Sequence, residues 1–404
     1  MVAGALSDLK IIELADFITG PYCAKVLADL GAEVIKVEPP TGDTARRWGP
    51  FGNDVPHPER SGLFLYLNTS KLGVTLDIDT GTGRDLLRRL VATADIIVEN
   101  YPPGWIEDRG LGYDALSAEN PGLIMTSITP FGQTGPYREF LATDLVSLQT
   151  GGLGYGIPGD IEDPQLPPLK ACGEQAEFLA GMMGALATMH AVFAREQDGR
   201  GSHVDVSTQA AVACGNFGNV ATYDYEGRVP SRLRAEGSQG TTAITFSCKD
   251  GDACFVLMEE RQWRDWVDVM GKPDWTTDPR FRDHEARMQN REALEAFLGD
   301  WCRQYTKAEV YRLAQAKRIP IMPIHTMDEV VRSPQLQARG FFRELRHPIA
   351  GNITYPGAPY QFSETPWQFT EAAPTLGQHN ELVFGERLGY PRESLVRLRQ
   401  AGIV

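Results

Sequence analysis

The chain has 404 residues, with 39 Lys and Arg against 53 Asp and Glu, which gives a formal net charge of −14 at pH 7. A nucleic-acid-binding surface needs a basic stripe, so this charge argues against nucleic-acid binding, although a local basic pocket for a small phosphate ligand stays compatible with it. With 42% hydrophobic and 23% charged residues, the composition is that of a globular protein. At roughly 100–200 residues per domain, it predicts two or three domains.

Membrane and metal signals are weak along the chain. Apolar stretches such as 185–193 fall short of the roughly 18 residues that a membrane span needs. No charged segment followed by an apolar one opens the sequence, so we expect a cytoplasmic protein without membrane contact. The six cysteines form no CxxC pair and the histidines lack metal-ligand spacing, so we expect no metal and mostly buried, reduced thiols.

Residues 1–130 alternate short β-rich runs with helical periods, which is typical of a parallel βαβ sheet. The pattern predicts strands over 11–14, 33–37, 74–78, 95–98 and 123–128. It predicts helices over 21–30 and 83–92, the second capped by Thr82. We therefore expect a Rossmann-like, doubly wound α/β domain.

The next segments are a loop and a long helix. Gly, Pro and Asp dominate 150–168, which predicts a surface loop. A helix is predicted over 174–196, apolar almost all round and therefore buried, with Gly181 and Gly184 allowing close packing. The run 203–206 predicts a further strand.

The composition changes near residue 225. A hairpin is predicted over 244–258 around a turn at 249–251, with amphipathic helices over 261–270 and 291–305 and a last helix over 394–400. We expect three parts, namely a large α/β domain over 1–224, a smaller α+β domain over 225–330, and a C-terminal segment over 331–404 that returns to the large domain.

Glu174 is the first candidate site residue. It begins the predicted long helix after a loop, where the helix dipole and unpaired N–H groups favour an ionised carboxylate. Such a carboxylate facing a cleft serves as a nucleophile or a base. The alternative is that Glu174 only helps the helix to start, with Glu177 as a nearer equivalent.

A second candidate site follows the predicted strand 95–98. Asn100 and Tyr101 come where open α/β sheets bind ligands, at the carboxyl end of a strand, and their amide and ring suit an adenine. A simple turn explains them equally well. Lys71 and Arg109 offer charges that pair with phosphate, or are merely solvated.

Ordered motifs along almost the whole chain resemble the class III CoA-transferase family, which includes formyl-CoA:oxalate and carnitine CoA-transferases and methylacyl-CoA racemases. The matching motifs are LGAEVIKVEPPTGD at 30–43, LNTSK at 67–71, ENYPPG at 99–104, FGQTGPY at 131–137, GSHVDVS at 201–207 and IPIMPI at 319–324.

The resemblance implies a Rossmann-like large domain, a small domain and an interlocked dimer of two ring-like chains. It implies that coenzyme A binds to the large domain, with Asn100 and Tyr101 holding the adenosine and with Lys71 and Arg109 near the phosphates. It further implies that a carboxylate at the start of the long helix attacks the acyl-CoA thioester, giving a mixed anhydride and then an enzyme-CoA thioester, from which a second acid takes CoA.

The chain departs from the family at the attacking carboxylate. Spacing to the motif GALA at 184–187 places Glu174 where the family has an aspartate. One extra methylene shifts the carboxylate by roughly 1 Å, and a misplacement of that size costs about 10²-fold in rate. Three hypotheses stay open, namely a working CoA-transferase with Glu174 as nucleophile, a catalytically silent subunit of a heteromeric transferase of the benzylsuccinate type, and an intramolecular CoA-transferring isomerase.

Other departures from the family pattern narrow the range of expected reactions and substrates. The racemases carry a His before the aspartate that aligns with Asp144, and here that position is Thr143, which argues against racemisation. Asp144 is then expected to shape the site as a polar neighbour of Glu174. Formyl-specific members carry a Gln where Ile18 stands, which indicates a larger or less polar acid. Residues 236–240 are either a flap over the intermediate or a linker turn. We expect a homodimer or a heterodimer with a homologous subunit.

Overall fold

A computed structural model describes residues 4–159, 161–233, 243–256, 259–369 and 371–404. The chain divides into two compact units. Unit 1 comprises Met1–Ile157, Pro168–Arg228 and Gly340–Val404, and unit 2 comprises Pro158–Pro167 and Val229–Arg339. Most of residues 1–224 and 331–404 fall in unit 1, but 158–167 and 331–339 belong to unit 2.

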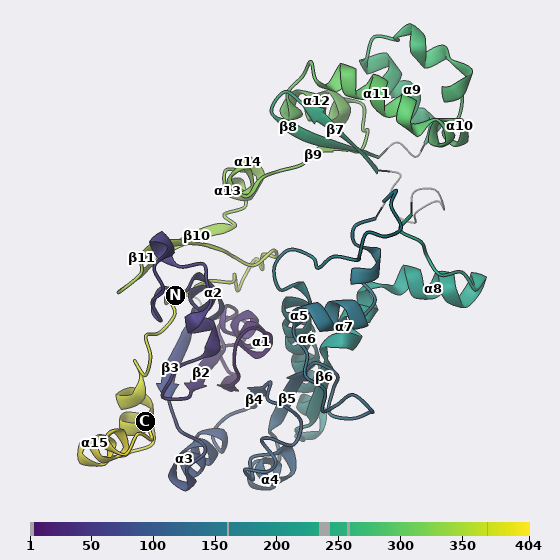
Figure 1. Ribbon diagram of the computed structural model, residues 1–404. Helices are drawn as coiled ribbons and strands as arrows, with labels where there is room; N and C mark the ends of the chain where they lie inside the picture. The colour runs from purple at the N-terminus through teal and green to yellow at the C-terminus, as the bar shows by residue number, and fades with distance from the viewer. Residues whose placement is uncertain (1–3, 160, 234–242, 257–258, 370) are drawn as a thin grey trace. The chain divides into compact units, whose positions relative to one another are not determined.

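Unit 1 is built on a six-stranded sheet in the order β3-β2-β1-β4-β5-β6, with every neighbouring pair parallel (Figure 1). The strands are β1 (Lys10–Leu14), β2 (Glu33–Glu38), β3 (Lys71–Thr75), β4 (Ile96–Glu99), β5 (Ile124–Thr129) and β6 (His203–Ser207). This is the doubly wound order, whose switch point lies between β1 and β4. The expected architecture is confirmed.

Helices cover both faces of this sheet. The α-helices of unit 1 are α1 (Thr19–Ala28), α2 (Gly62–Leu67), α3 (Gly81–Val91), α4 (Tyr113–Glu119), α5 (Asp144–Thr150), α6 (Gln175–Asp198), α7 (Thr208–Gly215), α8 (Phe217–Glu226) and α15 (Arg392–Gln400).

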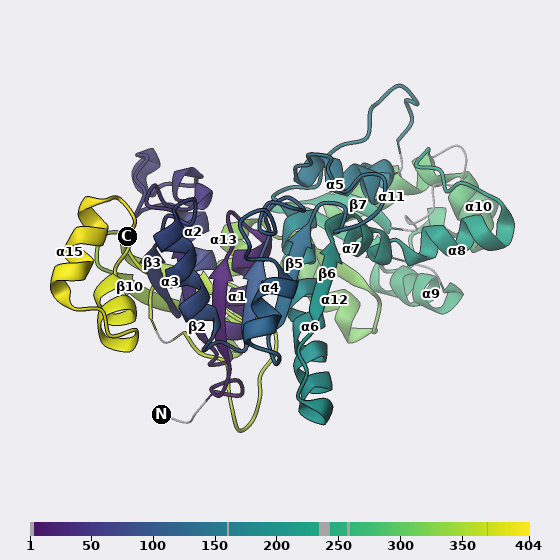
Figure 2. The ribbon, with the colours of Figure 1, turned by 90° about the horizontal axis from the view of Figure 1, so that it is seen from below.

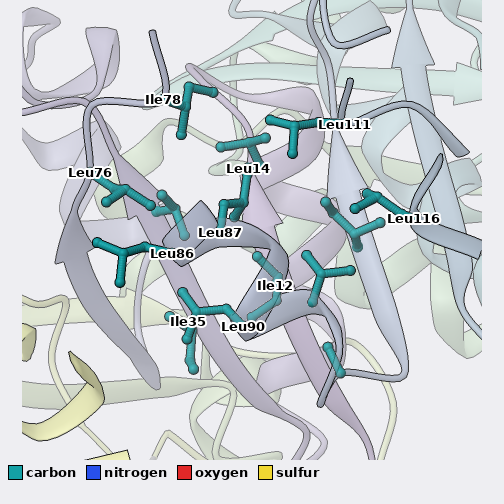
Figure 3. Close-up of a cluster of buried hydrophobic side chains, with 14 of the residues drawn as sticks. Ile12, Leu14, Ile35, Leu76, Ile78, Leu86, Leu87, Leu90, Leu111 and Leu116 are labelled. Carbon is teal, nitrogen blue, oxygen red and sulfur yellow. The ribbon is translucent and has the colours of Figure 1, made fainter. Parts of the chain in front are cut away.

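Alternate strand residues pack on opposite faces, as a pleated strand requires. Ile12 and Leu14 face a core that includes Leu86 and Leu90 of α3, whereas Ile11 faces a core formed with α1 and α6. Figure 2 looks at the side covered by α3 and α4, and Figure 3 shows the leucines and isoleucines of that core at close range.

Two predicted boundaries near β3 are wrong. The strand begins at Lys71 rather than at residue 74, because it pairs with β2 from Val34↔Lys71 onwards. Helix α3 is capped by Thr80, whose Oγ1 accepts a hydrogen bond from Gly83 N at 3.0 Å, and not by Thr82, which lies inside the helix. The predicted strand start is three residues too late and the predicted helix cap two residues too late.

Helix α6 is buried on one side only, which corrects the expectation of a fully buried helix. Ala180 and Thr188 are fully buried, while Leu186 and Phe193 are 51% and 66% exposed. A Cβ at Gly181 would meet Thr19 O at 2.6 Å, so the predicted close packing there is confirmed. Among the described helices, α6 alone has the length and apolar composition of a membrane span, and it packs against α1, β5 and β6.

Unit 2 is a small α+β unit. Its antiparallel sheet has the order β7-β8-β9, with β7 (Ala243–Cys248), β8 (Gly251–Val256) and β9 (Ile321–Pro323). Its helices are α9 (Glu260–Val269), α10 (His284–Gln289), α11 (Arg291–Cys302), α12 (Lys307–Ala316), α13 (Met327–Val331) and α14 (Pro334–Ala338). The predicted hairpin and both amphipathic helices are present. Residues 158–167 belong to this unit because Ile161 N donates a hydrogen bond to Arg232 O at 3.1 Å and Ile161 forms an isolated parallel β-bridge with Leu233.

The C-terminal segment completes unit 1. The hairpin of β10 (Phe342–His347) and β11 (Gly351–Pro356) precedes a π-helical stretch, Glu381–Arg387, and α15. Asn380 Oδ1 accepts from Thr75 N at 2.9 Å, and Ile403 O accepts from Asp77 N at 2.7 Å. Hydrogen bonds therefore hold the C-terminal segment against edge strand β3 and against the residues that follow β3.

Candidate active site

The start of α6 carries the first group of candidate residues. Glu174 is its N-cap residue, yet the Glu174 side chain makes no capping hydrogen bond. The cap comes instead from Asp144 in α5, whose Oδ1 accepts from Ala176 N at 2.7 Å and from Glu177 N at 3.2 Å. Asp144 is 3% exposed, so a buried carboxylate from another helix neutralises the positive end of α6.

Lys170 joins the two candidate carboxylates. Its Nζ lies 3.2 Å from Asp144 Oδ2 and 3.4 Å from Glu174 Oε2, and it also donates to Gly173 O. Partial burial lowers the pKa of Lys170, but the hydrogen bond and charge of Asp144 outweigh it and raise the pKa overall. The side chain of Glu174 keeps 25% of its surface exposed. Glu174 is therefore an accessible carboxylate beside an ammonium group.

Glu177 is a third carboxylate in this group. It lies in the first turn of α6, and burial together with the charges of Asp144 and Glu174 raises the pKa of Glu177 to about 7. The sequence prediction treated Glu177 only as a helix-starting residue and missed Lys170 altogether. The one sequence signal for Lys170 is its spacing of four residues from Glu174.

Asn100 lies at the switch point of the sheet, directly after β4. Its Oδ1 accepts from Asp16 N at 2.9 Å, and its Nδ2 donates to Asp16 O at 2.7 Å and to Thr19 Oγ1 at 2.8 Å. Both amide protons are thus used, and the amide ties the end of β4 to the loop between β1 and α1. In this structure Asn100 shapes the carboxyl edge of the sheet from within.

Tyr101 and Arg109 belong to one stack of side chains. The Tyr101 and Trp105 rings are parallel at 4.0 Å, and the Arg109 guanidinium lies 3.6 Å from the centroid of Trp105. Arg109 Nη2 also pairs with Asp79 Oδ1 at 2.6 Å. Since the side chain of Arg109 is 23% exposed, this stack presents a cation next to the switch point.

Lys71 lies in the interior, unlike Arg109. Its Nζ lies 2.6 Å from Glu13 Oε2 and donates to Pro21 O at 2.8 Å and to Asn68 Oδ1 at 2.9 Å. Burial lowers the pKa of Lys71 to about 8, against the effect of the Glu13 charge. Its three donors all have protein partners, so Lys71 is part of a buried ion-pair group and is not a surface cation.

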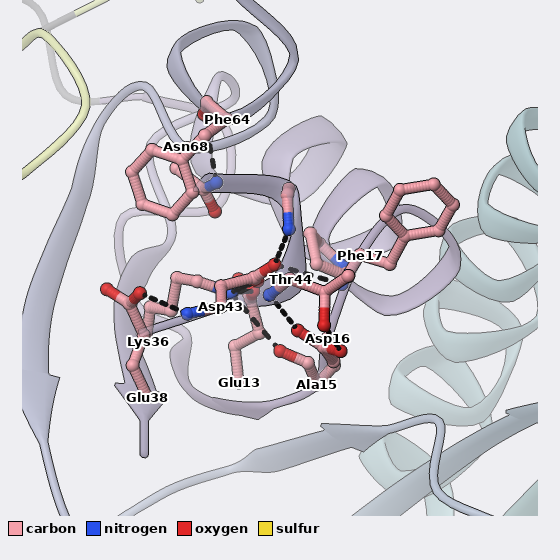
Figure 4. Close-up of polar contacts among 12 residues, drawn as sticks. Glu13, Ala15, Asp16, Phe17, Lys36, Glu38, Asp43, Thr44, Phe64 and Asn68 are labelled. Atoms are coloured by element: carbon pink, nitrogen blue, oxygen red, sulfur yellow. Dashed lines mark hydrogen bonds and ion pairs between the residues drawn. The ribbon is translucent and has the colours of Figure 1, made fainter. Parts of the chain in front are cut away.

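This buried group continues under the loop after β2 (Figure 4). Lys36 Nζ lies 2.8 Å from Glu13 Oε1 and 2.6 Å from Asp43 Oδ2, and all three side chains are buried. Burial alone would lower the pKa of Lys36, but Asp43 and Glu13 raise it. Asp43 Oδ1 in turn accepts from Phe17 N at 3.1 Å. The group thereby fixes the β1–α1 loop that Asn100 also holds.

Helix α1 lies between the two candidate groups. Thr19 at its start accepts from Asn100, and the ring of Tyr22, one turn later, packs edge-on against Phe178 of α6 at 4.9 Å. Thr19 O is also the atom nearest to a Cβ built at Gly181. The switch-point group and the α6 group are therefore joined through one short helix.

The other predictions fare as follows. The expectation of mostly buried thiols holds for half of the cysteines, since Cys23, Cys248 and Cys302 are buried, Cys254 is partly buried, and Cys172 and Cys214 are exposed. No group of three or more metal-ligating side chains occurs among the residues that the structure describes. Ile18 is fully buried before α1. Residues 236–240, predicted as a flap or a turn, lie outside the described residues.

The comparisons with known proteins decide the family. A family model described as CoA-transferase family III matches residues 6–380. The chain belongs to CoA-transferase family III. Subunit BbsE of succinyl-CoA:(R)-benzylsuccinate CoA-transferase from Thauera aromatica is 33% identical, with 98% of each chain covered. Succinyl-CoA–D-citramalate CoA-transferase from Chloroflexus aurantiacus is 31% identical, covering 99% of this chain and 98% of the relative.

A solved structure agrees with this membership. The crystal structure of a CaiB/BaiF family protein from Brucella suis matches with a TM-score of 0.85 and 30% identity, and it covers 96% of this chain and all of that one. The family III membership expected from the motifs is thus confirmed by sequence and by fold. The named relatives are CoA-transferases, and one of them is a subunit of a larger enzyme.

Proposed function

We propose that this protein transfers CoA from an acyl-CoA thioester to a carboxylic acid through a carboxylate-linked intermediate on Glu174. The observation that carries the proposal is the group at the start of α6, where an accessible Glu174 lies beside the Lys170 ammonium and Asp144 caps the helix. Family III relatives that are named as CoA-transferases support the same chemistry.

The proposed reaction proceeds by carboxylate attack. An oxygen of Glu174 attacks the thioester carbonyl, a C–O bond forms, the C–S bond breaks, and the CoA thiolate leaves a mixed anhydride behind. The thiolate then attacks the Glu174 carbonyl and releases the donor acid, leaving a glutamyl-CoA thioester. The acceptor carboxylate repeats these two steps in reverse order, takes the CoA and frees Glu174.

Lys170 and Asp144 have supporting roles in this proposal. Lys170 compensates the negative charge of Glu174 before the attack and that of the oxyanion during it. Asp144 holds the first turn of α6 through Ala176 N and keeps Lys170 in place at 3.2 Å. A displacement of about 1 Å costs about 10²-fold in rate, so the rigidity of this turn bears directly on whether a glutamate substitutes for an aspartate.

Glu177 is the alternative acceptor of the acyl group. It lies one turn into α6 and shares Asp144 as a neighbour, and with a pKa of about 7 it is partly ionised at neutral pH. Glu174→Gln and Glu177→Gln separate the two, since only the variant that lacks the nucleophile loses exchange completely. The proposal for Glu174 fails if Glu174→Gln exchanges CoA at the wild-type rate.

CoA is proposed to bind at the carboxyl edge of the sheet, outside β1 and β4. Tyr101 contributes an aromatic surface for the adenosine, and Arg109 contributes the phosphate-pairing cation. Arg109 is paired with Asp79 but keeps 23% of its side chain exposed. Lys71 is buried against Glu13, and the Asn100 amide is engaged with Asp16 and Thr19, so these two residues take part by fixing the shape of that edge. Isothermal titration with CoA and with dephospho-CoA tests this assignment.

A second candidate function is a catalytically silent subunit of a heteromeric transferase. The similarity to BbsE, which is named as a subunit, and the glutamate in the nucleophile position favour it. A CoA-exchange assay of the purified chain alone distinguishes a silent subunit from an active transferase, since a silent subunit exchanges no CoA until a homologous chain is added. An intramolecular isomerase would instead turn over without any free acceptor acid.

The chain is further proposed to act as a dimer with a second copy or with a homologous subunit. Large apolar side chains are exposed on α6 and α8, among them Phe193 at 66%, Phe217 at 75% and Tyr225 at 88%. Large apolar side chains left exposed on a folded chain favour an interface with another chain. Analytical ultracentrifugation of the isolated chain tests the proposed dimer, and a stable monomer that does not aggregate contradicts it.

A further inference from the structure

An apolar cavity of about 260 Å³, open to solvent on one side, lies beside the first two turns of α6. Its walls include Tyr22 of α1, Leu148 of α5, Val212 of α7, and Phe178 and Met182 of α6. None of the lining side chains carries a charge. The Tyr22 hydroxyl is hydrogen-bonded to Tyr66, so the phenol is satisfied away from the cavity.

The cavity adjoins the proposed acyl-accepting group. Gln175 and Ala176 both contribute to its lining, and Gln175 directly follows Glu174. Ala176 N is also the donor to Asp144 Oδ1. The polar turn that holds the carboxylates is thus continuous with an apolar recess, which is the arrangement that binds a molecule with a carboxyl group at one end and an apolar group at the other.

We propose that this cavity binds the apolar substituent of the acid that receives or donates CoA, and that the substituent is an aryl or branched-alkyl group. The inference rests on the proposed CoA transfer at the start of α6 and adds the class of acid. It concerns the non-reacting end of that acid, whose carboxyl group lies at Glu174.

Size and chemistry both favour this occupant. A cavity of roughly 150 Å³ lined by aliphatic and aromatic side chains is large enough for benzene, so this one accommodates a phenyl group with a short linker. The edge-on pair of Tyr22 and Phe178, at 4.9 Å, gives one wall the geometry in which aromatic rings pack. A second carboxylate has no cationic partner among the lining residues, and burying it there is unfavourable.

The test measures binding of free acids, which does not require catalysis. Hydrocinnamate and succinate are titrated into the full chain and followed by saturation-transfer NMR and by calorimetry. We expect hydrocinnamate to bind more tightly than succinate by roughly tenfold to a hundredfold, the factor that burial of one aromatic ring gives. Equal binding of the two acids, or no binding of hydrocinnamate, would overturn the proposal.

A matched pair of variants ties the binding to this cavity. Met182 and Leu186 lie one turn apart on α6 and are 48% and 51% exposed, but only Met182 lines the cavity. Met182→Trp should weaken hydrocinnamate binding at least about tenfold, and Leu186→Trp should leave it unchanged. Equal effects of both variants, or a change in dimerisation without a change in acid binding, would overturn the cavity assignment.

Failure of this inference and failure of the proposed function are distinguishable. Suppose that Met182→Trp weakens acid binding but that no covalent intermediate forms on the wild-type chain. The cavity assignment then stands, and the proposed transferase activity is refuted. If instead an intermediate is trapped on Glu174 but the chain does not prefer hydrocinnamate to succinate, the cavity assignment is refuted and the proposed transferase activity stands.

Discussion

The capping of α6 by Asp144 gives a prediction whose size follows from the structure. In Asp144→Ala, the N–H groups of Ala176 and Glu177 lose the acceptor that now lies at 2.7 and 3.2 Å, and Glu174 offers no replacement cap. Ala176 is 1% exposed, so water does not replace the lost bond there. A hydrogen bond to a charged group contributes about 1.5–3 kcal/mol and a carboxylate at a helix N-terminus about 0.3–1 kcal/mol.

These contributions predict that Asp144→Ala lowers the free energy of unfolding of unit 1 by about 3 kcal/mol. Urea unfolding followed by far-UV circular dichroism measures it. The matched control is Thr80→Ala, which removes an ordinary neutral cap from α3 and should cost about 1 kcal/mol. An Asp144→Ala loss no larger than that of Thr80→Ala would refute the assignment of Asp144 as the charged cap of α6.

Three further predictions concern other charged groups. Glu99 is buried and its pKa is raised by burial from 4.5 to about 7, so the folded state holds a proton that the unfolded state has lost. Stability therefore falls as pH rises from about 4.5 to 7. Glu177 contributes over the same pH range, so Glu99→Gln should reduce the fall in melting temperature with rising pH without abolishing it; an unchanged slope contradicts it. Lys36→Met removes the ammonium group that pairs with Asp43 and Glu13, of which Glu13 keeps Lys71 as a partner. The variant should destabilise unit 1 by about 3–5 kcal/mol in urea, and a loss below about 1 kcal/mol would count against the buried ion-pair group. Arg109→Ala should raise KM for acyl-CoA about tenfold with kcat unchanged, whereas a fall in kcat alone would place Arg109 outside the CoA site.

The sheet was predictable because its signal is local. Strands β1, β2, β4 and β5 are short runs rich in apolar residues that alternate with helical periods, and this alternation implies parallel pairing. Strand β3 was misplaced because its first residue is a lysine. Lys71 is tolerated in the sheet only through Glu13, Pro21 and Asn68, and no local pattern reveals such partners.

The candidate site was predictable only in part. The position of Glu174 at the start of a long helix followed from the loop before it, whereas the bond from Ala176 N to Asp144 joins residues 32 positions apart. The saturation of Asn100 by Asp16 and Thr19 depends on the β1–β4 crossover in the same way. Residue type and spacing predict the helices and strands, but contacts between residues far apart in the sequence decide which polar atoms remain available to bind a ligand.

The most direct test of CoA transfer is to trap the covalent intermediate. Purified chain is incubated with acyl-CoA thioesters, treated with borohydride and digested, and the peptides that cover Glu174 and Glu177 are analysed by mass spectrometry. We predict reduction of the Glu174 side chain to the alcohol, which reports an acyl-linked or CoA-linked intermediate on that carboxylate. An unmodified Glu174, under conditions in which a family member with an aspartate nucleophile is modified, would contradict it.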